Sequence, residues 1–363
     1  MSIRPKLRAL VVSIACALTP ILIACSEADP PPPAPTAAPA TATPIPSPSP
    51  EPTVEPVTTL LFTGDIIPAR CVYAEVQARG GDWTLPFQPL QPVLSAADLT
   101  IGTLDATISN AGVPIGCTPT FNLAGPAAVA GGLAFASYDV ISHAANHIKD
   151  CGNASCGDQS MYETADLLRA QGVAVAGTGA NLAEARTPVV VERNGVRFAF
   201  LAYDDIAPYY QATADTAGSA PLDTATITED IANARNAADV VIVLPHWGVE
   251  YTAVPSPRQR EVARIAADAG AALIVGNHAH WVQGHEQIGE TFVAYALGNF
   301  VFDQDWSIET QQGAMLEATF TGARLTSWRY IPVRIHDRHQ PRLADDAEAA
   351  QILERIEGGS PLH

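Results

Sequence analysis

Short apolar runs alternate along the chain with stretches of helical spacing, and polar side chains follow closely after several of these runs. The run 99–104, for example, stops at Asp105, and the run 240–244 leads to His246. Continuous apolar runs of this length predict buried strands, and their alternation with helices predicts an α/β fold. In open α/β sheets, ligands bind beyond the carboxyl ends of the strands. The polar residues at these ends are therefore expected to meet in one cleft, and they are Asp65, Asp105, Asn146, His147, His246, His278 and His280.

These side chains are of metal-binding types. Carboxylate, amide and imidazole groups together favour Mn, Fe or Zn over Ca or Mg. One or two divalent ions are expected, and two ions ~3.5–4 Å apart polarise a phosphoryl or carbonyl oxygen and activate water. Asp65 and Asp105 are the acids placed to bridge such a pair. Taken alone, a histidine such as His246 before Trp247 is explained by a buried structural role, but a whole set of polar groups would cost free energy if buried unpaired.

The first 24 residues have the character of a secretory signal. Arg4, Lys6 and Arg8 precede an apolar run over 9–24, which is shorter than the ~20 residues that a membrane-spanning helix needs. The run ends in the letters LIAC at 22–25, which resemble the bacterial lipobox. Cleavage before Cys25 and lipidation of its thiol are therefore expected, giving an extracytoplasmic lipoprotein anchored in the cell membrane. An uncleaved anchor, or a signal cut elsewhere, is the alternative.

Four segments are expected along the chain. The signal peptide at 1–24 is followed by a tether at 25–57, which is dominated by Pro, Ala and Thr. Such a segment cannot form a packed core and favours extended polyproline conformations. A globular domain then spans 58–336, and residues 337–363 form a C-terminal tail with one helix.

The chain is strongly acidic. It has Lys+Arg 20 against Asp+Glu 38, so its formal net charge is -18. Removal of the signal takes away three cations, and 17 minus 38 leaves -21. This charge argues against nucleic acid as a partner.

Four cysteines remain outside the signal and the lipidation site. An even set of four in an exported domain predicts two disulfides. Cys151 and Cys156 close a short loop and are the favoured pair, which leaves Cys71 with Cys117. A zinc site is the competing interpretation, and the long, irregular spacing and the oxidising compartment disfavour it.

Five motifs in the same order resemble those of a known family. They are FTGDII at 62–67, AANH at 144–147, HWGVEY at 246–251, GNHAH at 276–280 and LGNFVFD at 297–303. Together, over about 58–335, they resemble the CapA (poly-γ-glutamate capsule biosynthesis, PGA_cap) family of the calcineurin-like metallophosphoesterase superfamily. The resemblance implies an α/β fold of four αββα layers, with a central β-sandwich flanked by helices. Strand order alone suggests a single open sheet instead.

The resemblance also implies which residue binds which metal. The residues that match ligands of the first metal are Asp65 and His280, those that match ligands of the second are Asn146, His246 and His278, and the bridging acid falls at Asp105. Two positions depart from the family pattern. Ile67 stands where the superfamily usually has a histidine, and Asp105 replaces the family's glutamate with a side chain one methylene shorter. The second-metal site is therefore expected to be the tighter one.

Two further residues match catalytic positions of the family. His147 corresponds to the histidine that contacts substrate and can protonate a leaving oxygen. Arg70 matches an arginine near the pocket that could hold a phosphate or carboxylate bidentately, although a surface arginine is the simpler interpretation.

Two functions from different classes remain open. One is a metal-dependent, phosphoesterase-type hydrolase that acts on a phosphoester, or on an amide bond of an anionic wall polymer. The other is a non-catalytic accessory subunit that binds such a polymer and works with capsule synthase and export proteins. An acidic surface repels polyglutamate except at a local basic patch, for which Arg258, Arg260 and Arg264 on one predicted helix are the candidates.

The lipidation hypothesis makes a direct prediction. Mass spectrometry of membrane-extracted protein should find an amino-terminal peptide that begins at Cys25 and carries a diacylglyceryl mass. Replacing Cys25 with Ser should abolish this mass and the membrane association. A wild-type product that retains Ala24 would contradict the hypothesis.

Overall fold

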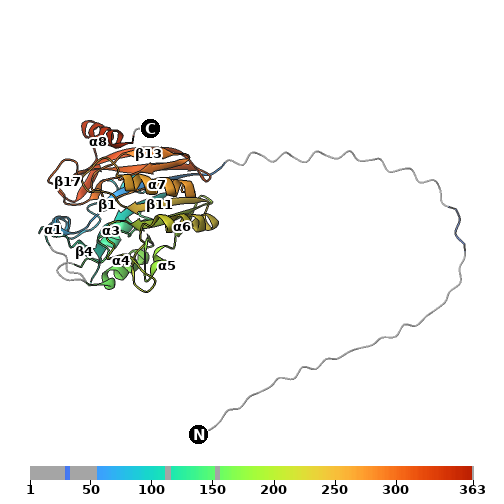
Figure 1. The fold of residues 1–363 in the computed structure, drawn as a ribbon, viewed down its shortest axis with the longest axis horizontal. Helices are drawn as coiled ribbons and strands as arrows, with labels where there is room; N and C mark the ends of the chain where they lie inside the picture. Colours follow the sequence, from blue (N-terminus) through green and yellow to red (C-terminus); the bar gives the residue numbers. More distant parts are fainter. Residues whose placement is uncertain (1–28, 33–54, 111–115, 152–155, 362–363) are drawn as a thin grey trace, which may run out of the picture. The chain divides into compact units, whose positions relative to one another are not determined.

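The computed structural model describes residues 29–32, 55–110, 116–151 and 156–361 (Figure 1). The signal peptide, Cys25 and most of the tether lie outside the described residues. The folded unit spans Val54–His363. All helices and strands that are described belong to this unit.

One sheet is built around the first predicted strand. Its eight strands include a path in the order β18-β17-β16-β1-β2-β5-β6, and β15 pairs with β1 beside that path. The strands β1, β2, β5 and β6 run parallel, whereas β16, β17 and β18 continue the sheet as antiparallel neighbours. The bounds are β1 Val57–Ile66, β2 Leu99–Leu104, β5 Val140–Ser142, β6 Ala174–Ala176, β15 Asn299–Val301, β16 Gln312–Thr321, β17 Arg324–His336 and β18 Gln340–Leu343.

A second sheet of six strands has the order β13-β14-β12-β11-β9-β8. Its central strands β9, β11, β12 and β14 are parallel. The hairpin between β8 and β9 turns at Asn194 and Gly195, which both have positive φ (53° and 79°), as a tight hairpin turn requires. The bounds are β8 Val189–Arg193, β9 Val196–Asp204, β11 Val240–His246, β12 Leu273–Val275, β13 His285–Ile288 and β14 Thr291–Ala294. Two small pairs complete the strands, β3 Thr107–Ile108 with β4 Ala124–Gly125, and β7 Thr178–Gly179 with β10 Gly218–Ser219.

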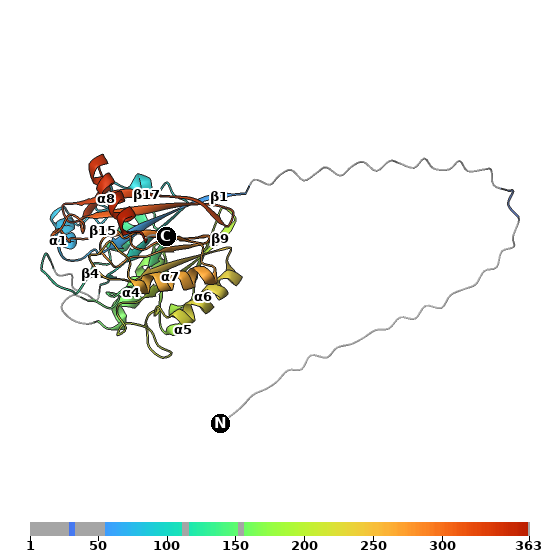
Figure 2. The ribbon, with the colours of Figure 1, turned by 45° about the horizontal axis from the view of Figure 1, so that its top comes forward.

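Helices cover the outer faces of both sheets. On the second sheet α6 and α7 lie side by side, as Figure 2 shows, and a shared apolar cluster joins them to β9 and β11. Another cluster joins α1, α3 and α4 to the first sheet. The helices are α1 Arg70–Ala78, α2 Gln91–Leu94, α3 Val129–Phe135, α4 Asp158–Ala170, α5 Leu182–Ala185, α6 Thr224–Ala237, α7 Pro257–Ala269 and α8 Asp346–Gly359.

The predicted four layers are confirmed by how β1 divides its side chains. Leu60 and Phe62 lie in a cluster with Phe198 and Phe200 of the second sheet, whereas Leu61 packs in the cluster under the outer helices. Successive residues of a strand point to opposite faces, so β1 supplies two cores at once. The fold is an αββα sandwich, and the single open sheet suggested by strand order alone is wrong.

Residues beyond the expected domain boundary at 336 are part of the folded unit. β18 pairs with β17, and Ile352 and Ile356 of α8 pack on Val282 and Ala314. Among the described residues, no helix combines the length and the apolar character needed to cross a membrane.

Both expected disulfides are formed, Cys71–Cys117 and Cys151–Cys156. Disulfides persist in oxidising compartments, so the folded unit has the chemistry of an extracytoplasmic protein.

A close backbone approach positions the end of β1. The Asp65 N–H donates to the Gly298 carbonyl at 2.9 Å, and a Cβ on Gly64 would lie 2.0 Å from that same oxygen. Only a glycine at position 64 therefore allows β1 to approach the backbone at Gly298, just before β15.

We expect Gly64→Ala to lower the free energy of unfolding by about 1–3 kcal/mol, because backbone has to move to admit the methyl group. The matched control is Gly131→Ala in α3, where a Cβ meets nothing within 4 Å. It should be neutral or stabilising, since alanine favours helix over glycine. Thermal and urea denaturation followed by circular dichroism measure both. Equal stabilities for the two variants would contradict the argument.

Candidate metal centre

The predicted metal ligands come from the carboxyl ends of strands in both sheets. Asp65 lies near the end of β1, and Asp105 directly follows β2. His246 ends β11, and its neighbours come from the loops after β5 and β12, which carry Asn146, His147, His278 and His280. Because the two sheets face each other, these ends meet at one edge of the sandwich.

His246 lies at the middle of the group. Its Nε2 is 2.8 Å from Asn146 Oδ1, 3.2 Å from His278 Nδ1 and 3.6 Å from Asp105 Oδ1. Its Nδ1 is 3.9 Å from Asp65 Oδ1. The structure thus brings these predicted ligands together.

His280 completes the set from the other side of Asp65. Its Nδ1 lies 3.6 Å from Asp65 Oδ2 and 2.9 Å from Asn299 Oδ1. A hydrogen bond of this kind fixes the ring orientation of a histidine. Asn299 belongs to the quoted LGNFVFD motif, but the sequence does not indicate that it contacts His280.

Several ligating atoms in this group are buried without a partner. They are Asp65 Oδ1, both carboxylate oxygens of Asp105, and His246 Nδ1, and none of them has a hydrogen bond within the described part of the chain. Buried oxygens of this kind carry an uncompensated desolvation cost. A divalent cation would compensate that cost, so the donor set fits a metal.

The side chains nevertheless contact one another directly. As they stand, no three His, Cys, Asp or Glu side chains among the described residues surround a point at which a metal ion would sit. To bind a metal, these side chains would have to rotate away from one another. The 2.8 Å contact between His246 and Asn146 would then break.

Burial and the neighbouring carboxylates determine the pKa values of the site residues. Burial raises the pKa of Asp65 well above its usual range, and the Asp105 charge raises it further. Burial likewise raises the pKa of Asp105 to about 7. The pKa values of His278 and His280 shift in the opposite direction. Burial lowers the pKa of His278 to about 3 and that of His280 to about 4. Neutral imidazoles are the form that ligates metals.

His147 pairs with a carboxylate that the sequence pattern did not single out. Its Nδ1 lies 2.5 Å from Asp150 Oδ2, and the Leu123 N–H donates to that same oxygen at 2.7 Å. Burial lowers the pKa of His147, but the carboxylates of Asp105 and Asp150 outweigh burial and the pKa is raised. The sequence could have indicated Asp150, because it is an acid only three residues after His147.

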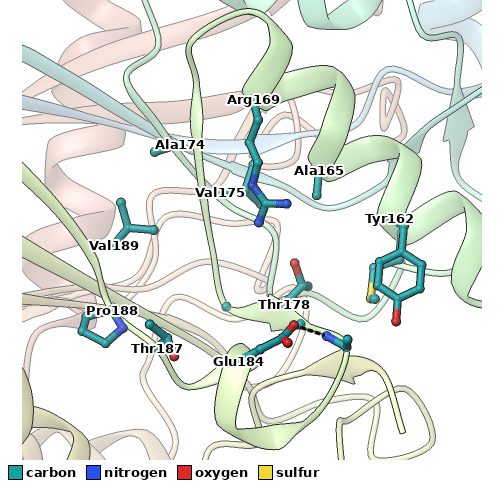
Figure 3. A pocket seen from close by; sticks show the side chains of 14 residues that line it. Tyr162, Ala165, Arg169, Ala174, Val175, Thr178, Glu184, Thr187, Pro188 and Val189 are labelled. Atoms are coloured by element: carbon teal, nitrogen blue, oxygen red, sulfur yellow. Dashed lines mark hydrogen bonds between the residues drawn. The ribbon is translucent and has the colours of Figure 1, made fainter. Parts of the chain in front are cut away.

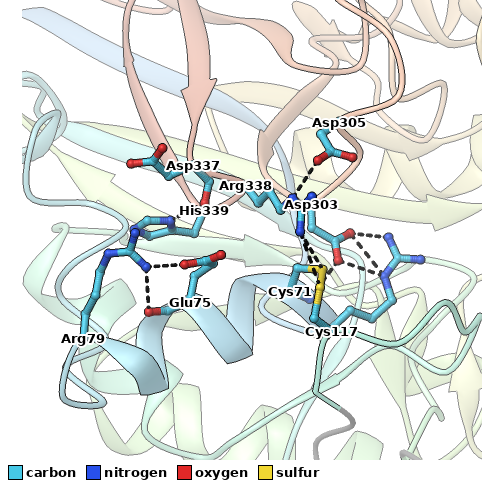
Figure 4. The surroundings of a disulfide bond; sticks show 10 residues. Cys71, Glu75, Arg79, Cys117, Asp303, Asp305, Asp337, Arg338 and His339 are labelled. Atoms are coloured by element: carbon cyan, nitrogen blue, oxygen red, sulfur yellow. Dashed lines mark hydrogen bonds and ion pairs between the residues drawn. A yellow bond between two sulfur atoms is a disulfide. The ribbon is translucent and has the colours of Figure 1, made fainter.

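Arg70 forms an ion pair with Asp303, an acid that is far away in the sequence. Its Nε donates to Asp303 Oδ1 at 3.1 Å, and its Nη1 donates to the Thr120 carbonyl at 3.1 Å. Asp303 also accepts from the Cys71 N–H at 2.8 Å, beside the Cys71–Cys117 disulfide (Figure 4). A substrate anion would have to compete with Asp303 for this guanidinium.

The side chains in Figure 3 line a cavity of about 490 Å³. It is bounded by α4, β6, α5 and the start of β8, and Arg169 and Glu184 are its charged residues. None of the predicted site residues lines it.

The αββα sandwich places the chain among α/β folds that resemble 5'-nucleotidase structures. A crystal structure of a putative 5'-nucleotidase from Staphylococcus aureus superposes with a TM-score of 0.51 at 10% identity, covering 83% of this chain and 58% of that one. At this identity the likeness shows the fold alone.

The family follows from sequence. The model of the family described as "Bacterial capsule synthesis protein PGA_cap" matches residues 59–304, and the chain belongs to this family. The "PGA biosynthesis protein CapA" of Bacillus subtilis (strain 168) is 30% identical over 285 residues, which are 78% of this chain and 73% of that protein. The "Capsule biosynthesis protein CapA" of Bacillus anthracis is also 30% identical, over 71% of this chain and 63% of that protein.

Two buried acids near the site should respond differently to neutralisation. Asp105 has no hydrogen bond to lose within the described residues, whereas Asp204 accepts from Ile206 N, Ala207 N and Ser219 Oγ. Burial raises the pKa of both acids, and an acid whose pKa is raised by folding destabilises the fold at a pH above that pKa. Only Asp204 offsets this cost with hydrogen bonds to its carboxylate. At pH 8 without metal, Asp105→Asn should therefore raise the melting temperature by about 2–4 °C.

Asp204→Asn is the matched control and should gain less than Asp105→Asn, because disturbing its hydrogen bonds opposes the benefit of removing the buried charge. Added Mn²⁺ or Zn²⁺ should raise it for the wild type and much less for Asp105→Asn, because ligands that bind the native state stabilise it. Differential scanning fluorimetry in chelator and in metal measures all of these. Equal shifts of melting temperature in Asp105→Asn and Asp204→Asn, or a loss of stability in Asp105→Asn, would contradict the assignment.

Proposed function

We propose that this chain is an extracytoplasmic, metal-dependent phosphoesterase that acts in the synthesis of a capsule or anionic wall polymer. The observation that carries the proposal is the buried carboxylate pair Asp65 and Asp105 beside the His147–Asp150 pair, because three of its four oxygens have no hydrogen bond among the described residues. Membership of the capsule synthesis family supplies the biological setting. Capsule synthase and export proteins are the partners that this setting suggests, with the lipid on Cys25 as the membrane anchor.

The ligand set would hold one or two divalent ions, Mn, Fe or Zn, through Asp65, Asp105, Asn146, His246, His278 and His280. When bound, such ions polarise a phosphoryl oxygen and activate water. Ile67 is fully buried in the apolar cluster of the first sheet, so the place of the usual histidine is filled by core. The site formed by Asn146, His246 and His278 is accordingly the tighter one.

The protein's own part in the reaction centres on His147. Asp150 holds its Nδ1, which leaves Nε2 as the atom for the substrate. As the water oxygen bonds to phosphorus and the bond from phosphorus to the leaving oxygen breaks, His147 gives its Nε2 proton to that leaving oxygen. The nearby carboxylates favour the protonated imidazole that this role requires.

The accessory-subunit alternative depends on a basic surface for an anionic polymer. The three arginines predicted for this role lie on α7, but each is paired with acids. Arg258 contacts Asp205, and Arg260 and Arg264 both contact Glu286. Their charges are therefore largely compensated, which favours the hydrolase.

We expect His147→Ala to keep the fold and the metal content while losing about 10²–10⁴-fold in rate on a phosphodiester or phosphomonoester. Asp150→Asn should follow it with a smaller loss, since it removes only the partner that orients the ring. His278→Ala is the contrasting variant and should lose metal as well. Elemental analysis and hydrolysis of p-nitrophenyl esters after Mn, Fe or Zn supplementation measure both properties.

The same variants decide between the two functions. If the wild type hydrolyses no phosphoester or γ-glutamyl amide, and polymer output in cells requires the chain but is unaffected by His147→Ala, the accessory role is correct. Less than ~0.3 metal per chain after supplementation would count against the metal centre itself.

A further inference from the structure

Two exposed aromatic side chains stand beside the metal centre. The rings of Tyr251 and Trp306 lie 5.8 Å apart between centroids and are nearly perpendicular, at 77°. Trp306 is 60% exposed and Tyr251 is 39% exposed. Tyr251 also stacks on His280, with centroids 6.0 Å apart at 27°. The two rings thus form an aromatic corner, and its Tyr251 ring stacks on the predicted metal ligand His280.

Tyr251 is held firmly in this corner. The Tyr251 N–H donates to the Ala279 carbonyl at 2.8 Å, and Gln304 Nε2 donates to Tyr251 Oη at 3.1 Å. Gln304 in turn accepts from Asn299 Nδ2 at 3.0 Å, and Asn299 is the residue that contacts His280. Tyr251 has φ of 60°, a conformation that a bulky residue adopts only when its surroundings impose it. One network therefore fixes Tyr251 and His280 relative to each other, and Trp306 contacts the Tyr251 ring edge to face.

The charge beside the corner is negative. Glu250, the exposed residue before Tyr251, supplies a carboxylate that acts electrostatically on Tyr251, Asp65 and Asp105. Arg70 is close enough to influence Tyr251 but is paired with Asp303. An anionic group gains nothing at this place, whereas a cation is favoured.

We propose that Tyr251, Trp306 and Glu250 form a subsite for an ammonium group of the substrate, placed next to the phosphoester that the metal centre would hold. Aromatic faces attract organic cations through their quadrupole, and a carboxylate adds charge. The inference rests on the proposed phosphoesterase function and narrows its substrates to zwitterionic phosphoesters. Single exposed aromatics are ordinary on protein surfaces. Here the corner is stacked on His280 and joined to it by hydrogen bonds.

The test compares two probes that differ only in charge. They are p-nitrophenyl phosphorylcholine and its carbon isostere, in which a tert-butyl group replaces trimethylammonium. With the Mn-loaded full chain, kcat/KM should favour the cationic ester by about tenfold, within the usual range of cation–π attraction. Trp306→Ala and Glu250→Gln should each bring this ratio close to one, and Trp306→Phe should retain most of it. Tyr162→Ala, at a similarly exposed aromatic position on α4, is the control and should leave the ratio unchanged.

A binding measurement separates this inference from the proposed function. Isothermal titration with phosphorylcholine and its isostere should show tighter binding of the cationic ligand, by a margin that Trp306→Ala removes. If no ester is hydrolysed but this margin is found, the subsite stands and the hydrolase fails. If both esters are hydrolysed equally, or the isostere is preferred, the hydrolase stands and the ammonium subsite is wrong.

Discussion

The desolvation of two carboxylates governs the architecture around them. Asp65 and Asp105 are fully buried, and three of their four oxygens lack a hydrogen-bond partner among the described residues. Burying such groups without compensation costs several kcal/mol on the usual scales, about 1–3 for each unsatisfied group. The fold retains them because the surrounding sandwich is large enough to offset this cost. Neutral histidines, with pKa values lowered by burial, surround them and complete a set of donors suited to a cation.

Part of this arrangement could be predicted from the sequence. The strand-end positions of Asp65, Asp105 and His246 follow from apolar runs that stop at polar residues, and parallel strands of a sheet bring their carboxyl ends to one edge. The division into two sheets did not follow from those runs. It depends on which strand pairs with which, and strand order read along the chain does not contain that information.

The partners of the site residues were harder to foresee for a related reason. Asp303 reaches Arg70 across 233 positions in the chain, and Trp306 reaches Tyr251 only because their loops converge over His280. A charged residue in an isolated segment has the same sequence signature whether it is solvated or paired. The three arginines of α7 illustrate this, because they resemble a basic patch in the sequence and are compensated by Asp205 and Glu286 in the fold. Asp150, only three residues from His147, was the one partner within local reach.

The positions of the two disulfides can be explained by their closeness to site residues. Cys71 directly follows Arg70, and Cys151 directly follows Asp150, so each bridge begins one residue after a side chain that lines or supports the site. Cys71 lies in the first turn of α1, whereas Cys117, Asp150 and Cys151 lie in loops, which have few regular hydrogen bonds and open easily. A crosslink that limits the freedom of the loop in the unfolded chain favours its native arrangement. In an acidic protein whose central carboxylates repel each other, these bridges hold Arg70 and the His147–Asp150 pair in place whether or not a metal compensates the charge.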